Sequence, residues 1–243
     1  MISKAKLKLI KSLKYKKTRD ELNLFLVEGI KGILEVLNSK YNVIFTVVSK
    51  KIFENHKNSF DINNVYVLDE DDINNFSLLK NNRDGFCVVK SVSKDFSFKK
   101  LGKVSIALDS LNDPGNFGTI IRNADWFGIQ NIICSKDCVD LYNPKVIQSS
   151  MGSFTRVDVY YQDLEKVFSN DCSVIGTTSD QNKLITPKNF KKGIILFGNE
   201  SRGISKQLEP YVDSWISIKK LGDAESLNVS VSTGIILDNL LNS

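Results

Sequence analysis

In the amino-terminal part of the chain, short apolar runs alternate with stretches of helical spacing. Four apolar runs predict strands, at residues 24–29, 43–48, 65–68 and 86–92. Apolar residues three and four positions apart predict helices over residues 4–13 and 30–37. A further helix is expected to begin at the acidic residues 69–72, because carboxylates favour the amino-terminal end of a helix dipole. This alternation predicts a small α/β domain over residues 1–95.

A polar, lysine-rich stretch separates this domain from a second series of alternating elements. Residues 96–103 have the composition of a linker, and a second domain is expected over residues 104–243. Its strands are predicted at residues 104–108, 132–134, 157–161, 174–177, 194–197 and 214–219. Its helices are predicted at residues 119–127, 144–151 and 164–168, and from about residue 204. Strands that alternate with helices favour a mostly parallel, open sheet.

Near the carboxyl terminus, local propensity points to a strand. The segment from Asn228 to Ile236 is rich in valine, isoleucine, threonine and serine. Since β-branched residues are enriched in strands, the residues alone predict an extended segment here.

Positive charge is concentrated at the amino terminus. The chain has 33 Lys and Arg against 28 Asp and Glu, a formal net charge of +5. The segment from Met1 to Arg19 is lysine-rich and contains no acidic residue. Such an arm fits contact with the phosphates of RNA, and it equally fits a solvated basic tail.

Composition argues against a membrane-spanning segment, a signal peptide and a metal site. The chain has no apolar run of about 18 residues, and its basic amino terminus lacks the apolar centre of a signal peptide. We therefore expect a cytoplasmic protein without membrane contact. The cysteines, at positions 87, 134, 138 and 172, lie in apolar surroundings and are expected to be reduced core thiols. His56 is the one histidine, so neither a metal site nor histidine catalysis is predicted.

Two late strands end in loops that suit a small-molecule site. The run 194–197 stops at Gly198-Asn199, and the strand that begins at Ser214 ends in the glycine-bearing loop 221–223. Small residues with free backbone groups at the carboxyl ends of strands are typical of ligand sites in α/β proteins. Ordinary turns have the same composition, so the loops alone leave both interpretations open.

Three motifs in order change that balance. They are Asn116-x-Gly118-x-x-x-Arg122, Gly198-Asn199-Glu200-x-x-Gly203 and Ser226-Leu227-Asn228-Val229-Ser230. With them the chain resembles the SpoU (TrmH-type) branch of the SPOUT RNA methyltransferases. The resemblance implies a carboxyl-terminal domain with a mostly parallel sheet and a trefoil knot, and a helix, not a strand, after Asn228. The segment from Arg19 to Gly29 resembles the small, L30e-like α/β domain that binds RNA in many of these proteins.

The resemblance implies methyl transfer from S-adenosylmethionine to a ribose 2′-hydroxyl, with ribosomal RNA as the favoured substrate and a homodimer formed through the second domain. The implied cofactor-binding residues are Thr177, Gly198, Ile218, Leu227 and Asn228. The implied catalytic residues are Arg122, Asn116, Glu200 and Asn228. By residue type Glu200 could be a general base, but capping of the helix expected from about residue 204, or bracing of its own loop, is the favoured interpretation. The family commonly has Pro-Met where this chain has Lys219-Lys220, which puts details of the cofactor pocket in doubt.

RNA contacts are expected from Lys14, Lys16, Lys17 and Arg19, whereas Phe25 and Leu26 are expected to pack in the core. A transfer-RNA ribose methyltransferase and a non-catalytic RNA-binding protein are the alternatives. The intact motif residues argue against loss of catalysis. A nicotinamide-dependent oxidoreductase is disfavoured, because no G-x-G-x-x-G motif follows the first strand of either domain.

Overall fold

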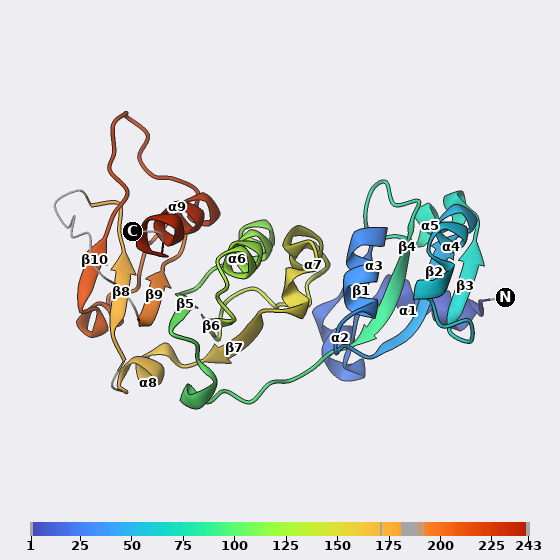
Figure 1. Ribbon diagram of the computed structural model, residues 1–243, viewed down its shortest axis with the longest axis horizontal. Coiled ribbons are helices and arrows are strands. Elements are labelled where there is room, and N and C mark those ends of the chain that lie inside the picture. Colours follow the sequence, from blue (N-terminus) through green and yellow to red (C-terminus); the bar gives the residue numbers. More distant parts are fainter. Residues whose placement is uncertain (1, 171, 181–189, 191, 242–243) are drawn as a thin grey trace. The chain divides into compact units, whose positions relative to one another are not determined.

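The computed structural model of the protein describes residues 2–170, 172–180, 190 and 192–241 (Figure 1). Contacts along the chain define two compact units. The first unit comprises Met1–Ser93 and Asp140–Thr155, and the second comprises Lys94–Val139 and Arg156–Ser243. The segment 140–155 thus packs with the amino-terminal residues although it lies far along the sequence. The functional domain boundaries expected from the sequence stay a prediction.

The first unit is a mixed α/β structure whose strands lie in the order β1-β4-β2-β3. Strand β4 is antiparallel to both β1 and β2, and β3 is parallel to β2. The elements are α1 (Lys4–Ser12), α2 (Lys16–Leu22), β1 (Leu24–Glu28), α3 (Ile30–Leu37), β2 (Val43–Ser49), α4 (Lys50–Asn55), η1 (Lys57–Ser59), β3 (Val65–Leu68), α5 (Glu70–Phe76), β4 (Gly85–Lys90), α7 (Pro144–Ser150) and η3 (Ser153–Thr155).

Two apolar clusters stabilise this unit. Ile10 of helix α1 and Leu13, which directly follows that helix, pack in one cluster with Leu26, Phe45 and Phe86 of the sheet. A second cluster is aromatic, and it joins β1 to the segment 140–155. In it the ring of Phe25 lies 4.4 Å from that of Tyr142 and 5.9 Å from that of Phe154. The expected core positions of Phe25 and Leu26 are confirmed, since they are 0% and 1% exposed.

The second unit is built on a six-stranded sheet in the order β10-β8-β9-β5-β6-β7, and every pair in it is parallel. The mostly parallel sheet expected from the sequence is therefore confirmed. The elements are η2 (Phe98–Lys100), β5 (Val104–Leu108), α6 (Pro114–Trp126), β6 (Asn131–Ser135), β7 (Asp158–Gln162), α8 (Leu164–Phe168), β8 (Val174–Thr177), β9 (Gly193–Phe197), η5 (Glu209–Tyr211), β10 (Ser214–Ile216) and α9 (Val229–Leu241).

Three sequence-based expectations in this unit need correction. Helix α6 begins at Pro114 and not at residue 119, because Asp113 caps it and proline suits its first turn. No helix starts near residue 204 in the described chain; turns lead instead to the short 3₁₀ segment η5. Propensity wrongly predicts a strand after Asn228: α9 is a helix, as the family resemblance implies.

The physical reason for α9 is tertiary packing. Its buried side chains include Thr233, Ile236, Leu237 and Leu240. The helix packs beside α6, as Figure 1 also shows. Burial of these residues against a neighbouring helix overrides the weak local preference of β-branched residues for strands.

Candidate active site at the carboxyl edge of the second sheet

The cofactor residues expected from the sequence lie at the carboxyl ends of three neighbouring strands. Thr177 is the last residue of β8, Gly198 directly follows β9, and Ile218 lies just beyond β10. These strands are adjacent in the sheet, in the order β10-β8-β9. The carboxyl edge of a parallel sheet is where α/β proteins bind their ligands. The fold therefore brings together three residues that are far apart in the sequence.

Asn116 is placed by the cap of α6. The Asp113 side chain accepts a hydrogen bond of 2.7 Å from the Asn116 amide, as an N-cap residue does. Asn116 thus belongs to the first turn of α6, a helix that the sequence predicts to begin only at residue 119. Its backbone is fixed by the cap, and its side chain remains available to the neighbouring loops.

A hydrogen-bond network joins the three motifs through this side chain. Asn116 Nδ2 donates to Glu200 Oε1 at 3.1 Å. Asn116 Oδ1 accepts a bond of 2.9 Å from Asn228 Nδ2. The Ser230 hydroxyl lies 3.5 Å from the same oxygen. Residues separated by more than eighty positions in the sequence therefore meet at one amide group.

Asn228 has a second role, as the cap of α9. Its Oδ1 accepts bonds of 2.9 Å from the Ser230 amide and 3.3 Å from the Val231 amide. The Ser230 hydroxyl donates to the same oxygen at 2.7 Å. Asn123 of α6 donates from Nδ2 to the Ser230 carbonyl at 2.8 Å, so α6 and the start of α9 are held together.

The loop after β9 folds tightly on itself. Asn199 and Gly203 exchange two backbone hydrogen bonds, of 3.0 and 2.9 Å. A Cβ atom at Gly198 would lie 2.1 Å from the Gly203 carbonyl carbon, so position 198 has no room for a side chain. Glu200 sits exposed in this turn. No helix begins near residue 204 in the described chain, so Glu200 does not cap one there. Its observed partner is Asn116, which fits the alternative that Glu200 braces its loop.

Sequence reasoning missed the residues that fasten the loop after β5 to the loop after β9. The buried Asp109 accepts hydrogen bonds from the Ser205 amide at 2.7 Å and from the Ser205 hydroxyl at 2.6 Å. Asn199 Nδ2 donates to the Ser110 carbonyl at 2.7 Å. Ser110 has a φ of 55°, an uncommon backbone conformation for serine. The position of Asp109 directly after a strand was the one available signal.

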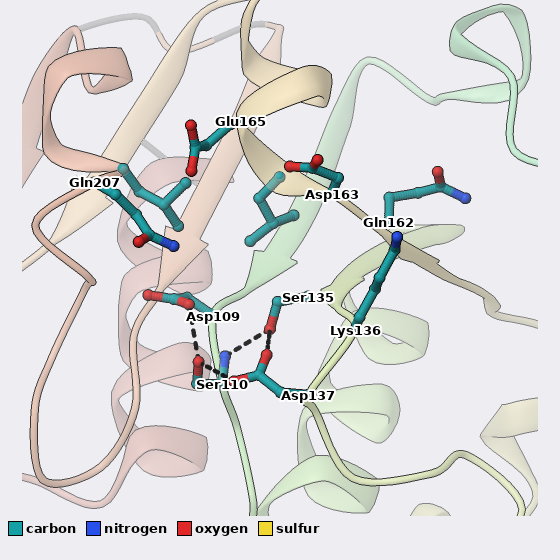
Figure 2. A pocket seen from close by; sticks show the side chains of 11 residues that line it. Asp109, Ser110, Ser135, Lys136, Asp137, Gln162, Asp163, Glu165 and Gln207 are labelled. Carbon is teal, nitrogen blue, oxygen red and sulfur yellow. Dashed lines mark hydrogen bonds between the residues drawn. The ribbon is translucent and has the colours of Figure 1, made fainter.

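A polar cavity of about 330 Å³ opens beside these loops, at the carboxyl ends of β5, β6 and β7. Figure 2 shows Ser110 and Ser135 in contact with Asp137 at its base. The bonds from Ser110, of 2.6 Å, and from Ser135, of 2.5 Å, hold the pKa of the Asp137 carboxyl below its ordinary value. None of the catalytic or cofactor residues expected from the sequence lines this cavity.

Arg122 lies on the exposed part of α6. Its guanidinium makes no hydrogen bond or ion pair with the part of the chain that the structure describes. A free guanidinium presents a planar fork of donors that matches a phosphate group. This side chain is therefore available to an anionic ligand.

The four residues expected to contact RNA divide into two groups. Lys14, Lys16 and Lys17 are exposed. Arg19 is 4% exposed, and its Nη2 pairs with Asp140 Oδ2 at 2.7 Å. Its Nη1 also donates to the carbonyls of Leu13 and Lys14, each at 2.9 Å. Arg19 thus has its donors occupied by protein groups, which favours a structural role.

In the described ranges, no group of three or more His, Cys, Asp or Glu side chains could hold a metal ion. No helix in the same residues is long and apolar enough to cross a bilayer. No disulfide joins the four cysteines, and Cys87, Cys134 and Cys138 are buried.

Fold and site together define an α/β protein whose second unit has a parallel sheet with strand-end loops at its carboxyl edge. Comparison with protein families gives its class. Residues 103–238 match the SpoU rRNA Methylase family, and residues 4–84 match the MRM3-like substrate binding domain. The chain belongs to the SpoU rRNA methylase family.

The alignments of this chain with curated relatives span different shares of those relatives' lengths. The chain is 26% identical to the 23S rRNA (guanosine(2553)-2′-O)-methyltransferase RlmP of Bacillus subtilis, with 97% of this chain and 95% of that protein aligned. It is 31% identical to an uncharacterized tRNA/rRNA methyltransferase of Borreliella burgdorferi over 61% of this chain and 71% of that protein. It is 31% identical to an uncharacterized tRNA/rRNA methyltransferase of Synechocystis, but the match spans only 52% of that relative.

Solved structures resemble the whole chain. An rRNA methyltransferase from Sinorhizobium meliloti has a TM-score of 0.81 and 25% identity, covering 99% of this chain and 95% of that one. The SpoU methyltransferase AviRb from Streptomyces viridochromogenes, in complex with the cofactor AdoMet, has a TM-score of 0.85 and 22% identity, covering 98% of both chains. At the latter identity the likeness shows the fold alone.

Proposed function

We propose that this protein transfers a methyl group from S-adenosylmethionine to a ribose 2′-hydroxyl of ribosomal RNA. The observation that carries the proposal is the network in which Asn116 contacts both Glu200 and Asn228, at 3.1 and 2.9 Å. It unites the three family motifs at the carboxyl edge of the sheet. A protein that had lost catalysis would have no need to keep these three exposed or half-exposed polar groups in register.

The residues at this edge fit the proposed cofactor. Gly198 and Ile218 lie at strand ends, and the apolar side chain of Leu227 is 49% exposed. Uncharged peptide groups can recognise an adenine edge, and an apolar surface suits its rings. S-adenosylmethionine would supply an activated methyl carbon. Lys219 and Lys220, which replace the family's usual Pro-Met, are exposed.

Each catalytic residue is assigned a role from its contacts. S-adenosylmethionine, when bound, would give its methyl carbon to the ribose 2′-oxygen and leave as S-adenosylhomocysteine, while the hydroxyl proton would pass to solvent water. We assign to Arg122 the clamping of a neighbouring phosphate and the stabilisation of negative charge that develops on the oxygen. A guanidinium with a pKa above about 12 is a poor base, so this role suits it better than proton abstraction.

Asn116 is assigned the orientation of the substrate hydroxyl, with Glu200 and Asn228 as the groups that fix its amide. Glu200 accepts from the Asn116 NH₂ group and Asn228 donates to its oxygen, which together determine which way the amide faces. Preorganised groups of this kind lower the reorganisation required during reaction.

Ribosomal RNA is favoured over transfer RNA by the relative from Bacillus subtilis, which aligns along nearly its full length and is named for 23S rRNA. The match of residues 4–84 to a substrate-binding domain supports RNA contact by the first unit. An enzyme with this substrate would act where ribosomes are made, and we place it in the cytoplasm.

A homodimer is part of the proposal. On α9, Val231 and Ile235 are 51% and 37% exposed, and Trp126 at the end of α6 is 84% exposed. Helices α6 and α9 pack together, so these apolar side chains belong to one helix pair. Large exposed apolar residues on packed helices are typical of subunit interfaces. Sedimentation of the wild type and of a Val231→Glu variant would test this, with a monomeric wild type as the contrary result.

The activity is tested by incubating the protein with labelled S-adenosylmethionine and RNA from a strain that lacks it. Ribosomal and transfer RNA are supplied separately, and the products are digested with alkali. A 2′-O-methyl group blocks cleavage, so label in an alkali-resistant dinucleotide from ribosomal RNA is expected. Label only from transfer RNA would change the substrate. No label in either pool, together with no binding of S-adenosylmethionine, would overturn the proposed function.

A further inference from the structure

Tyr15 is an exposed aromatic residue within the most basic segment of the chain. Among the aromatic residues of the described first unit, it is the one whose side chain is largely exposed, at 57%. Lys14 and Lys16 flank it and, like Lys11 and Lys17, are exposed. Lys17 lies 3.9 Å from Glu21, a distant pair of exposed groups that leaves the lysine accessible.

The side chain of Tyr15 has few partners among the described residues. Within the described chain its hydroxyl makes no hydrogen bond and its ring pairs with no other aromatic ring. Its one ring contact is with Lys14, whose Nζ lies 4.7 Å from the ring centroid. Tyr15 stands at the N-cap position of α2, yet its side chain makes no capping bond. Burial does not explain why an aromatic residue stands here.

The backbone around Tyr15 is nevertheless fixed on both sides. The Tyr15 amide donates to the Ser12 carbonyl at 3.1 Å, and its own carbonyl accepts from the Arg19 amide at 3.2 Å. The buried Arg19 guanidinium holds the carbonyls of Leu13 and Lys14. Its pair with Asp140 holds the guanidinium in turn. An exposed ring on a fixed backbone needs little ordering when a ligand binds.

We infer that Tyr15 is a stacking platform for one unpaired base of the RNA substrate, with Lys14, Lys16 and Lys17 contacting the phosphates on either side. Arg19 is then the positioning residue of this subsite and not a phosphate contact. This inference takes the identity of the ligand, RNA, from the proposed function and adds a subsite to that function. Aromatic side chains flanked by cations are the usual means by which proteins bind single-stranded RNA. A base within a duplex is already stacked and cannot use the ring.

The test compares two fluorescein-labelled RNA probes, a hairpin with a loop of unpaired adenines and a blunt duplex of the same stem sequence. Tyr15→Leu is expected to weaken binding of the hairpin by about 5- to 100-fold, the usual range for loss of one base–aromatic stack, and to leave the duplex unchanged. Tyr15→Phe keeps the ring and should bind like the wild type. Leu22→Ala, an exposed apolar residue on α2 that is 48% accessible, is the matched control.

Salt dependence separates stacking from charge. For Lys14→Ala, the slope of log affinity against log salt should fall in magnitude by about 0.7, as expected for one lost phosphate contact to a single strand. Tyr15→Leu should lower affinity at every salt concentration without changing that slope.

Equal hairpin binding by Tyr15→Leu and the wild type, or an equal loss on both probes, would overturn the inference. Methyl transfer by the wild type to ribosomal RNA is measured in parallel. If the wild type methylates RNA and Tyr15→Leu binds the hairpin normally, the stacking subsite alone fails. If the wild type neither methylates nor binds RNA, the proposed function fails with it.

Discussion

Two arginines, one in each compact unit, belong to motifs that the sequence links to RNA, and the structure places them in opposite environments. Arg19 is 4% exposed, pairs with Asp140, and donates to two backbone carbonyls. Arg122 is exposed on α6 and makes no ion pair with the described residues. Both are arginines in segments that the sequence links to RNA, so residue type alone does not distinguish them.

The difference shows that a basic residue in a binding motif acts either on the ligand or on the protein's own backbone, depending on burial. A buried guanidinium must have its donors satisfied within the protein, because an unpaired buried charge is costly. An exposed one keeps its donors for a ligand. Arg19 should therefore affect mainly folding, and Arg122 mainly catalysis.

The largest effect is expected from Arg19→Ala. Removal of one partner leaves Asp140, whose side chain is 16% exposed, without its counter-ion. Loss of one partner of a buried pair costs about 3–5 kcal/mol in the free energy of unfolding. Urea unfolding followed by circular dichroism measures it. Arg156→Ala is the control, because Arg156 pairs with Asp125 at 2.8 Å in a more exposed setting, and should cost less than about 1 kcal/mol. Equal stability of the two variants would contradict a structural role for Arg19.

Arg122→Ala should lower methyl transfer by about 100-fold or more, since one donor to a developing oxyanion contributes about 3 kcal/mol to the transition state. Its unfolding curve should match the wild type, because the guanidinium has no partner in the described chain. Single-turnover assays with saturating RNA separate the chemical step from binding. Arg122→Lys keeps the charge but loses the fork of donors, and an intermediate rate is expected. Near-normal turnover of the lysine variant would argue against a geometric role.

Asn228 has both a structural and a catalytic role, and two variants should separate them. The expected effects on stability and on activity are smaller than those for Arg19 and Arg122. Asn228→Ala removes the α9 cap, at a cost of about 1 kcal/mol in stability, and also removes the bond to Asn116. Asn228→Asp keeps an oxygen for the cap and loses the donor to Asn116. The aspartate variant should therefore unfold like the wild type but transfer methyl groups more slowly. Equal activity of Asn228→Asp and the wild type would show that the bond to Asn116 is not used.

Much of the architecture could be read from the sequence. Apolar runs such as 194–197 and 104–108 are long enough to identify buried strands, and their alternation with helices indicates a parallel sheet. The start of α6 could not be placed as well. Asp113-Pro114-Gly115 is common in turns, and only the bond from the Asn116 amide to Asp113 shows that it opens a helix. The expected trefoil knot stays a prediction.

The sequence predicted which residues belong to the candidate site better than it predicted which residues they contact. The motifs single out Asn116, Glu200 and Asn228, but the sequence favoured Glu200 as a loop brace or as the cap of a helix that the described chain does not contain. Asp109 and Ser205, which join two of the loops, belong to no motif quoted from the sequence. Pairings between distant loops depend on how strands order themselves in a sheet, and local patterns carry no record of that order.

By itself, the sequence determined the strands, the alternation of elements, the basic amino-terminal segment and, through three motifs, the family of this protein. Those features depend on residue type and short spacings, which act locally. Local propensity predicted a strand where α9 is a helix, and only tertiary packing explains that helix. Only the tertiary structure, likewise, shows that Arg19 is buried against Asp140 and that Tyr15 remains exposed. Each of these depends on which distant residues cover a side chain, because burial fixes whether its polar groups and apolar surface meet protein or solvent.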